Sequence, residues 1–221
     1  KRPKYGRFLY ISNLLCETGF YFFISRNLFW SISIFIWYYL LGGNMNLKKI
    51  EGITTISIFI ISFLIHFMYD FFPYTFVSFF CPVNESIWEH MKILYTSIIL
   101  GSVIKYFLLK INRIKYNNFS LSLFISCFSS IIIYLIIYLP IYNFMGENLI
   151  ISIMLMLIVY GIISLISYNI MKYKDLNIWN SISIIFLIWG YVIFIILTYR
   201  PFHNYIFYDT LHNGYGIDIK K

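Results

Sequence analysis

The sequence predicts an all-α fold, a polytopic bundle of transmembrane helices, and three observations support this. Hydrophobic residues make up 60% of the 221 residues, whereas charged residues make up only 12%. The mean hydropathy of +0.76 is that of a membrane protein, not of a soluble domain. Five apolar runs match the roughly 20 residues that a helix needs to cross the hydrocarbon core. We therefore expect five core spans joined by short connections.

Each expected span is an apolar run that ends at charged or turn-forming residues. The five runs cover 53–72, 87–109, 119–139, 149–171 and 178–198. At one set of their ends lie Lys48, Lys49, Lys105, Lys110, Arg113, Lys115, Lys172 and Lys174. The other ends have only Lys92 and Arg200, with Lys220 and Lys221 at the terminus. The positive-inside rule therefore places the first set in the cytoplasm and the C-terminal tail outside it.

The basic balance of the chain follows from this topology. The formal net charge is +8, but the basic residues lie at span ends and form no single solvated patch. We therefore expect membrane lipid, and no nucleic acid, as a partner. The three cysteines, Cys16, Cys81 and Cys127, show no C-x-x-C spacing. Neither a disulfide framework nor a cysteine-rich zinc site is indicated.

Residues 1–44 form a separate hydrophobic extension. Two apolar stretches, 8–24 and 28–41, are divided by Arg26 and Asn27. One additional span would place the basic pair at 48–49 outside the cytoplasm, whereas a hairpin or an interfacial segment keeps it inside. Met45 and the residues after it resemble a natural protein start. We expect 45–221 to be a single transmembrane helical domain.

The densest polar segment is PVNESIWEHMK, residues 82–92. Glu85 and Glu89 are four residues apart and share a helical face, while His90 points about 100° away. The two carboxylates are candidate catalytic proton acceptors, supported by Asn84 and Lys92.

The same segment also fits a helix start. Ser86 and Glu89 have the spacing of a capping box, in which Ser86 accepts a first-turn N–H and Glu89 accepts the Ser86 N–H. Glu89 would then be architectural, whereas Glu85 and His90 are not explained by capping.

All four histidines fall on the extracytoplasmic side in this topology. His66 and Asp70 are four residues apart at one end of the first span, where ionisable groups are expensive without a partner. A carboxylate in this position can orient a metal-binding imidazole, or the pair can be a hydrogen bond between helices.

The tail after residue 198 adds further candidate ligands. It contains His203, Asp209 and His212 among many aromatic residues, with Arg200 at its start. Arg200 could pair with a lipid headgroup or with a loop carboxylate. The tail also fits an interfacial anchor with incidental histidines, and Asn213-Gly214 predicts a turn.

We expect these polar groups to lie close together, because burying each one without a partner costs free energy. Scattered buried imidazoles and carboxylates would be expensive in a bundle this apolar. We therefore expect the metal-ligand candidates to approach each other, namely His66, Asp70, His90 and at least one of His203 and His212. The ion would be Zn²⁺ or another divalent metal.

The segment at 82–92, with His66 and Tyr69 before it and Tyr215-Gly-Ile217 at the end, resembles an uncharacterised family. That family consists of small polytopic membrane proteins of Gram-positive bacteria, and the resemblance covers about residues 46–217. It implies a multi-pass protein of the bacterial cell membrane and implies no reaction. A weaker likeness is to alkaline-ceramidase and adiponectin-receptor-like membrane hydrolases, which hold zinc with His and Asp at span ends. Here His203 and His212 lie nine positions apart in a tail.

Two classes of function remain open from the sequence, with a structural or immunity-type protein as a third. In the first, a metal-dependent hydrolase acts on a lipid or lipid-linked substrate that enters from the outer leaflet. In the second, the cluster is the cation, proton or solute site of a transporter or solute-binding component. A transporter needs polar or broken helices in the middle of the membrane, and the last three spans offer mainly Ser, Asn and Gly. We therefore rank transport second.

Overall fold

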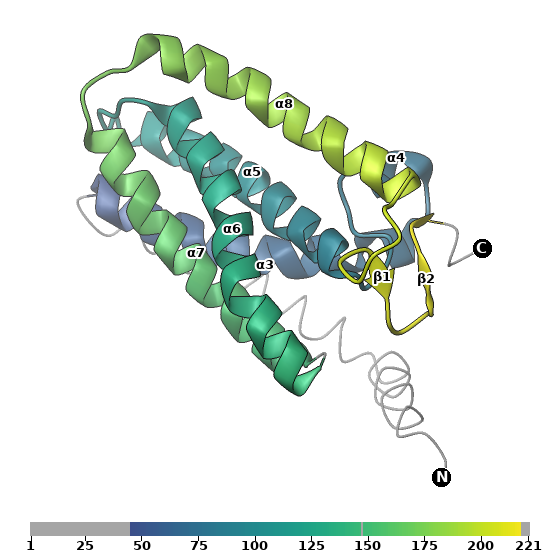
Figure 1. The fold of residues 1–221 in the computed structure, drawn as a ribbon. Helices are drawn as coiled ribbons and strands as arrows, with labels where there is room; N and C mark the ends of the chain where they lie inside the picture. The colour runs from purple at the N-terminus through teal and green to yellow at the C-terminus, as the bar shows by residue number, and fades with distance from the viewer. Residues whose placement is uncertain (1–44, 147, 218–221) are drawn as a thin grey trace. The chain divides into compact units, whose positions relative to one another are not determined.

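Five helices of the computed structural model are long and apolar enough to cross a membrane, which confirms the predicted helical bundle. The structure describes residues 45–146 and 148–217, so the expected N-terminal hairpin or interfacial segment lies outside the described residues. The long helices are α3 (Leu47–Phe71), α5 (Ile87–Ile111), α6 (Phe119–Met145), α7 (Leu149–Lys172) and α8 (Asn177–Tyr199). Figure 1 shows their order.

Local capping explains where the helices begin. α3 starts before the expected residue 53 because the Asn46 side chain accepts a hydrogen bond from the Lys49 amide. Asn148 caps α7 in the same way, through the Ile151 amide. α6 continues past Pro140 to Met145, although the apolar run predicted an end at 139. The other bounds agree with the expected spans to within about two residues, the usual uncertainty of helix ends.

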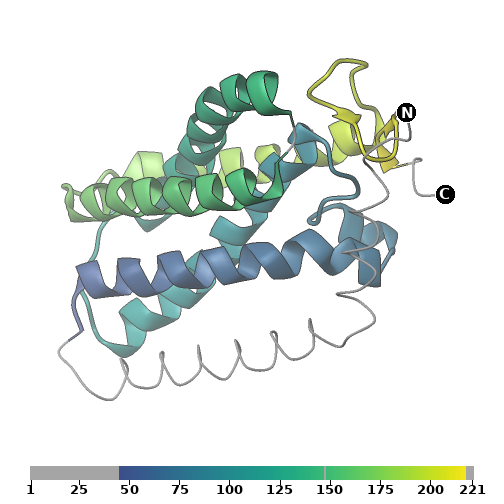
Figure 2. The same cartoon turned by 90° about the horizontal axis from the view of Figure 1, so that it is seen from below.

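The helices pack as two pairs with an outer helix added. α3 packs against α5, α6 packs against α7, and α3 also contacts α7, as Figure 2 shows. α8 packs on α6 and leaves most of its surface uncovered. Close approach depends on small residues, since a methyl group at Gly101 would collide with Ile58 of α3.

One end of the bundle, which we call the basic end, carries exposed Lys110, Arg113, Lys115, Lys172 and Lys174. Asn118 joins the two connections there: its amide nitrogen donates to the Lys174 carbonyl at 2.8 Å, and its amide oxygen accepts from the Leu176 amide at 2.8 Å. Asn118 is buried and adopts a positive φ of 51°, which asparagine tolerates better than most residues.

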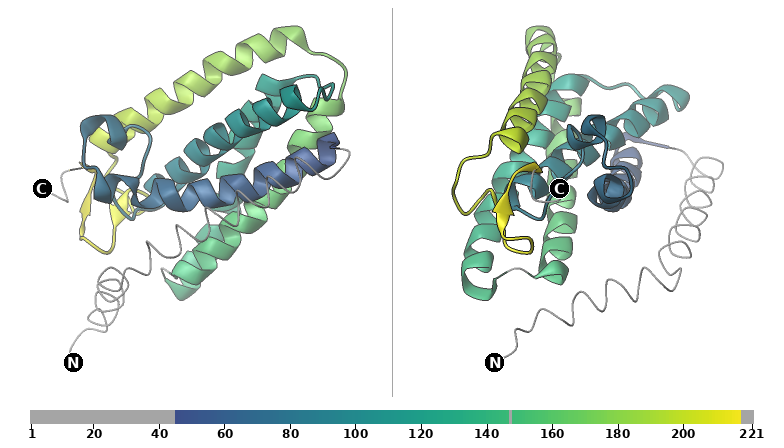
Figure 3. Two further views of the ribbon diagram at one scale, coloured as in Figure 1. Left: turned by 180° about the vertical axis from the view of Figure 1, so that it is seen from behind. Right: turned by 90° about the vertical axis from the view of Figure 1, so that its right-hand side faces the viewer.

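The opposite end, which we call the ribbon end, holds the polar segment and the C-terminal tail. A short helix, α4 (Thr75–Ser78), lies in the connection between α3 and α5. The tail forms an antiparallel ribbon of β1 (Tyr208–Asp209) and β2 (Gly214–Tyr215), visible in the right panel of Figure 3. The predicted Asn213-Gly214 turn connects these strands, with Asn213 at φ 56°. The ribbon is a small β element that the all-α prediction did not contain.

Candidate functional site

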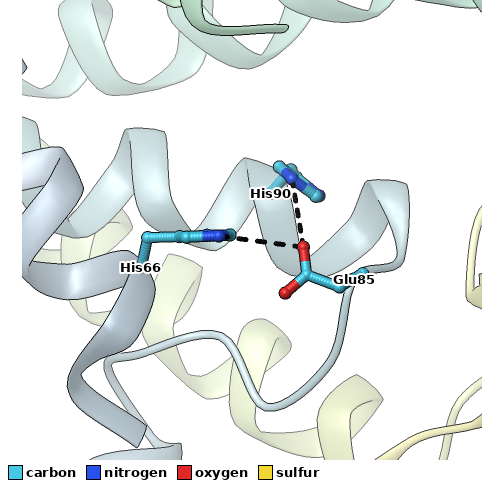
Figure 4. Close-up of side chains that lie close together, drawn as sticks. All are labelled: His66, Glu85 and His90. Atoms are coloured by element: carbon cyan, nitrogen blue, oxygen red, sulfur yellow. Dashed lines mark ion pairs between the residues drawn. The ribbon is translucent and has the colours of Figure 1, made fainter. Parts of the chain in front are cut away.

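Two histidines and one glutamate meet at the ribbon end. His66 comes from the last turns of α3, His90 from the first turn of α5, and Glu85 from the connection just before α5. The Nε2 atoms of His66 and His90 lie 3.8 Å and 3.7 Å from the Glu85 Oε2 atom. Both imidazoles point toward that carboxylate in Figure 4. One ligand atom from each residue lies within 4.8 Å of the others, so the group can hold a metal ion.

The His90 ring is held in the orientation that a metal ligand needs. Its Nδ1 atom lies 3.0 Å from the Ser86 carbonyl oxygen, which can only accept a hydrogen bond. In the neutral ring Nδ1 therefore carries the proton, and Nε2 presents its lone pair toward Glu85. Metal-binding histidines are commonly oriented in this way, by donation from the other ring nitrogen to a carbonyl or carboxylate.

Distances and exposure fit a divalent ion. A tetrahedral site with bonds of about 2.0–2.1 Å places its ligand atoms about 3.3 Å apart. The two histidine–Glu85 distances of 3.8 and 3.7 Å are close to this value, and all three ligand atoms lie within 4.8 Å of one another. The side chains of His66, Glu85 and His90 are 18%, 23% and 12% exposed. The group is therefore largely sheltered but still reachable from solvent, as a site with an open coordination position must be.

The other predicted ligands take different positions. Asp70 is exposed at the end of α3, and the three-residue group does not include it. His203 is exposed, and its ring packs edge-on against Tyr215 at 4.7 Å between centroids. The His212 Nδ1 atom pairs with the Asp209 Oδ2 atom at 2.8 Å. The structure thus brings His66 and His90 together with Glu85, which the sequence suggested as a catalytic proton acceptor, and the group within 4.8 Å includes neither Asp70 nor a tail histidine.

Glu89 forms a buried ion pair. Its Oε2 atom lies 2.6 Å from the Lys92 Nζ atom, with both side chains at most 1% exposed. The Thr198 hydroxyl donates to Oε1 at 2.7 Å, and the Val83 amide donates to Oε2 at 3.1 Å. Both carboxylate oxygens are thus bound by protein groups, which leaves Glu85 as the carboxylate at the histidines.

The capping box forms only in part. Ser86 Oγ accepts the Glu89 amide at 3.4 Å, as predicted. The prediction that the Glu89 side chain accepts a hydrogen bond from the Ser86 amide is wrong. The Ser86 amide donates instead to the Asn84 Oδ1 atom at 2.9 Å. Asn84 therefore takes over the role expected of the glutamate, in a local side-chain turn that asparagine favours.

Two lysines counted as span-end charges are buried. Lys92 donates from Nζ to the Ser78 carbonyl at 3.0 Å, in addition to its pair with Glu89. Lys105 pairs with Glu51 of α3, with 2.9 Å between Nζ and Oε1. A buried ammonium needs such a partner, so neither residue marks a membrane surface. Arg200 is exposed and forms no ion pair with any residue in 45–146 or 148–217, so the expected carboxylate partner in the loop is not found.

Asp209 is fully buried and connects the tail to the polar segment. Its Oδ2 atom accepts the Glu85 amide at 3.1 Å, and its Oδ1 atom accepts the Leu211 and His212 amides at 2.8 and 3.0 Å. Burial by itself raises the pKa of Asp209, but these hydrogen bonds and the His212 side chain outweigh it. The net effect lowers the pKa, so the carboxylate is charged at neutral pH.

A second polar cluster, missed in the sequence, lies near the basic end. Lys105 donates to Ser167 Oγ at 2.7 Å, and Ser167 donates to Glu51 Oε1 at 2.9 Å. These groups line a narrow cavity between α3, α5, α6 and α7. The buried Thr54 hydroxyl also lines it and has no hydrogen-bond partner among the described residues. Glu51 lies just outside the apolar run that begins at 53, which hid it from the sequence argument.

The sequence matches one family model over residues 43–217. The chain belongs to DUF6512, a family of unknown function. This confirms the expected membership of an uncharacterised family, over nearly the range predicted from the polar segment. No curated protein and no solved structure matches the chain. DUF6512 membership brings no reaction with it, so the function has to be argued from the site.

Proposed function

We propose that this DUF6512 protein is a metal-dependent hydrolase of the bacterial cell membrane. The observation that carries the proposal is the convergence of two imidazoles on one carboxylate, with ligand atoms within 4.8 Å of one another and the His90 Nδ1 atom held 3.0 Å from the Ser86 carbonyl oxygen. His66, His90 and Glu85 would hold the ion. Two histidines and a glutamate form the ligand set of several catalytic zinc sites, in which water takes the fourth position.

The chemistry follows from that ligand set. When bound, a divalent ion polarises a carbonyl or phosphoryl oxygen and makes its bound water more acidic. The Ser86 carbonyl orients His90 through Nδ1, which would leave Nε2 to bind the ion, and the Glu85 carboxylate would supply the negative charge that a cation requires. The partial exposure of all three side chains leaves access for water and for one polar group of a substrate.

The substrate class follows from the position of the site. The candidate ligands lie at one end of α3 and α5, two apolar helices long enough to cross the bilayer. A polar headgroup at the membrane surface reaches such a position while its chains stay in the hydrocarbon. We therefore propose a lipid or lipid-linked molecule, cleaved near its headgroup.

Metal analysis of the detergent-purified full chain tests the proposal. We expect about one zinc or other transition-metal ion per chain, as in a mononuclear catalytic site. His66→Ala, His90→Ala and Glu85→Gln should each lose that ion, and should lose the release of headgroup or acyl chain from labelled lipids. His203→Ala is the matched control, because that imidazole is exposed and outside the group. Wild-type protein without stoichiometric metal would contradict the proposal.

The second polar cluster favours a second candidate, proton-coupled transport. Glu51, Lys105 and Ser167 are buried within membrane-length helices and line a cavity, a placement typical of intramembrane proton or ion sites. Tyr160 extends the cavity lining toward the middle of α5 through a 2.9 Å contact between its hydroxyl and Ser97.

Reconstituted protein separates the two candidates. With a pH-sensitive dye inside liposomes, a transporter should dissipate an imposed pH gradient, and Glu51→Gln should stop this while His90→Ala should not. A hydrolase should show the opposite pattern in the lipid-cleavage assay. Gradient decay equal to that of protein-free liposomes would exclude the transport candidate.

A further inference from the structure

The C-terminal tail binds the segment that carries Glu85 at three separate points. Asn84 Nδ2 donates to the Gly216 carbonyl at 2.9 Å, the Glu85 amide donates to Asp209 Oδ2 at 3.1 Å, and the Trp88 amide donates to the Ile206 carbonyl at 3.0 Å. These contacts span more than a hundred residues of sequence, and they surround the position of one candidate ligand.

The central contact is the one with the most specific chemistry. Asp209 is 0% exposed, and its carboxylate accepts hydrogen bonds from three backbone amides and contacts the His212 ring, so its partners come from two chain segments. Charged acceptors form hydrogen bonds stronger than neutral ones, and a buried carboxylate has no water to replace them. Asp209 therefore fixes the backbone amide of Glu85, and the side chain of the same residue faces His66 and His90.

We propose that Asp209 is a positioning residue of the metal site, which orients the ligand Glu85 by binding its backbone amide. The proposal rests on the metal site proposed above. It makes the tail a component of that site, although no tail residue is a ligand. Groups that orient metal ligands typically contribute about 10–100-fold to metal affinity.

The two oxygens of Asp209 allow a selective test. Oδ1 binds the Leu211 and His212 amides within the tail, whereas Oδ2 binds the Glu85 amide and the His212 ring. Asp209→Asn keeps one acceptor for the tail amides but turns the other atom into an N–H donor, which cannot accept from Glu85. His212→Ala is the matched control, because it removes the ring partner and leaves all three backbone amides bound to Asp209.

The experiment measures zinc affinity by chelator competition, and the absorption spectrum of the Co²⁺-substituted protein, for the full chain in detergent. We expect Asp209→Asn to bind zinc about 10–100-fold more weakly than wild type and to show a changed Co²⁺ spectrum, with His212→Ala close to wild type. Asp209→Ser is a second variant, because serine can still bind the tail amides while its shorter side chain does not reach Glu85.

The outcomes separate this inference from the proposed function. Wild-type protein that binds no metal would overturn both. Wild-type affinity and spectrum in Asp209→Asn and Asp209→Ser would overturn the positioning role and leave the metal site standing. Equal weakening in His212→Ala and Asp209→Asn would also overturn it, because the effect would then belong to the His212–Asp209 pair.

Discussion

Some polar residues at the ribbon end are candidate metal ligands, whereas others have a structural role. Their contact partners distinguish the two kinds. Glu85 and Glu89 are both in the polar segment. The buried Glu89 carboxylate is fully engaged, because it pairs with Lys92 and accepts hydrogen bonds from Thr198 and Val83. Glu85 is 23% exposed and faces two imidazoles. A carboxylate whose lone pairs are already bound in a dry environment is poorly placed for chemistry, whereas one beside imidazoles is well placed for it.

The buried pair makes a prediction for Glu89→Gln. Removing the charge leaves the Lys92 ammonium buried without a counter-ion, a change that typically costs about 3–5 kcal/mol. We expect a clearly lower thermal unfolding temperature in detergent, followed by circular dichroism. The double variant Glu89→Gln, Lys92→Met removes the unpaired charge and should recover much of the loss.

The capping interpretation makes the opposite prediction for the same variant. Glutamine also serves in a capping box, so a purely capping Glu89 would lose about 1 kcal/mol or less. An unchanged unfolding temperature in Glu89→Gln would therefore show that the pair with Lys92 does not form.

At the scale of helices, packing depends on close approach at glycine. A methyl group at Gly101 would meet the Ile58 side chain, and one at Gly190 would meet the Tyr95 hydroxyl. Membrane helices associate through such small residues, because lipid offers no hydrophobic drive toward contact. α3 and α5 carry both His66 and His90, so their separation also sets the distance between the two imidazoles.

Gly101→Ala should loosen this pair of helices. Overpacking typically costs about 1–3 kcal/mol, so we expect a lower unfolding temperature and weaker metal binding. Gly161→Ala is the matched control, because a methyl group there has no neighbour within 4 Å. It should leave both measurements close to wild type. Equal effects of the two variants would contradict the role of the α3–α5 contact.

At the scale of the whole molecule, the positively charged residues fall into an exposed group and a buried group. Exposed lysines and one arginine gather at the basic end, whereas Lys92 and Lys105 are neutralised by Glu89 and Glu51 inside the protein. Only charges that reach water at the membrane surface contribute to orientation. Excluding the two buried lysines leaves the predicted orientation unchanged.

This orientation is testable with fusion reporters. A reporter inserted between Arg113 and Lys115 should be active on the cytoplasmic side, and one fused after Lys221 should be active outside the cytoplasm. Alkaline phosphatase and a fluorescent protein, which fold on opposite sides, provide reciprocal measurements. A cytoplasmic C-terminus would contradict the site argument, because the histidines would then not share a compartment with an outer-leaflet substrate.

The sequence by itself determined the five membrane-length helices, because apolar length is a local property that the bilayer selects directly. It also located the polar segment and the turn at Asn213-Gly214. Only the tertiary structure decided that Glu85 joins His66 and His90, that Asp209 binds the Glu85 amide, and that Glu51 pairs with Lys105. These choices depend on which helix faces meet and where a distant tail docks. Sequence spacing carries no information about contacts between segments 54 or 124 residues apart.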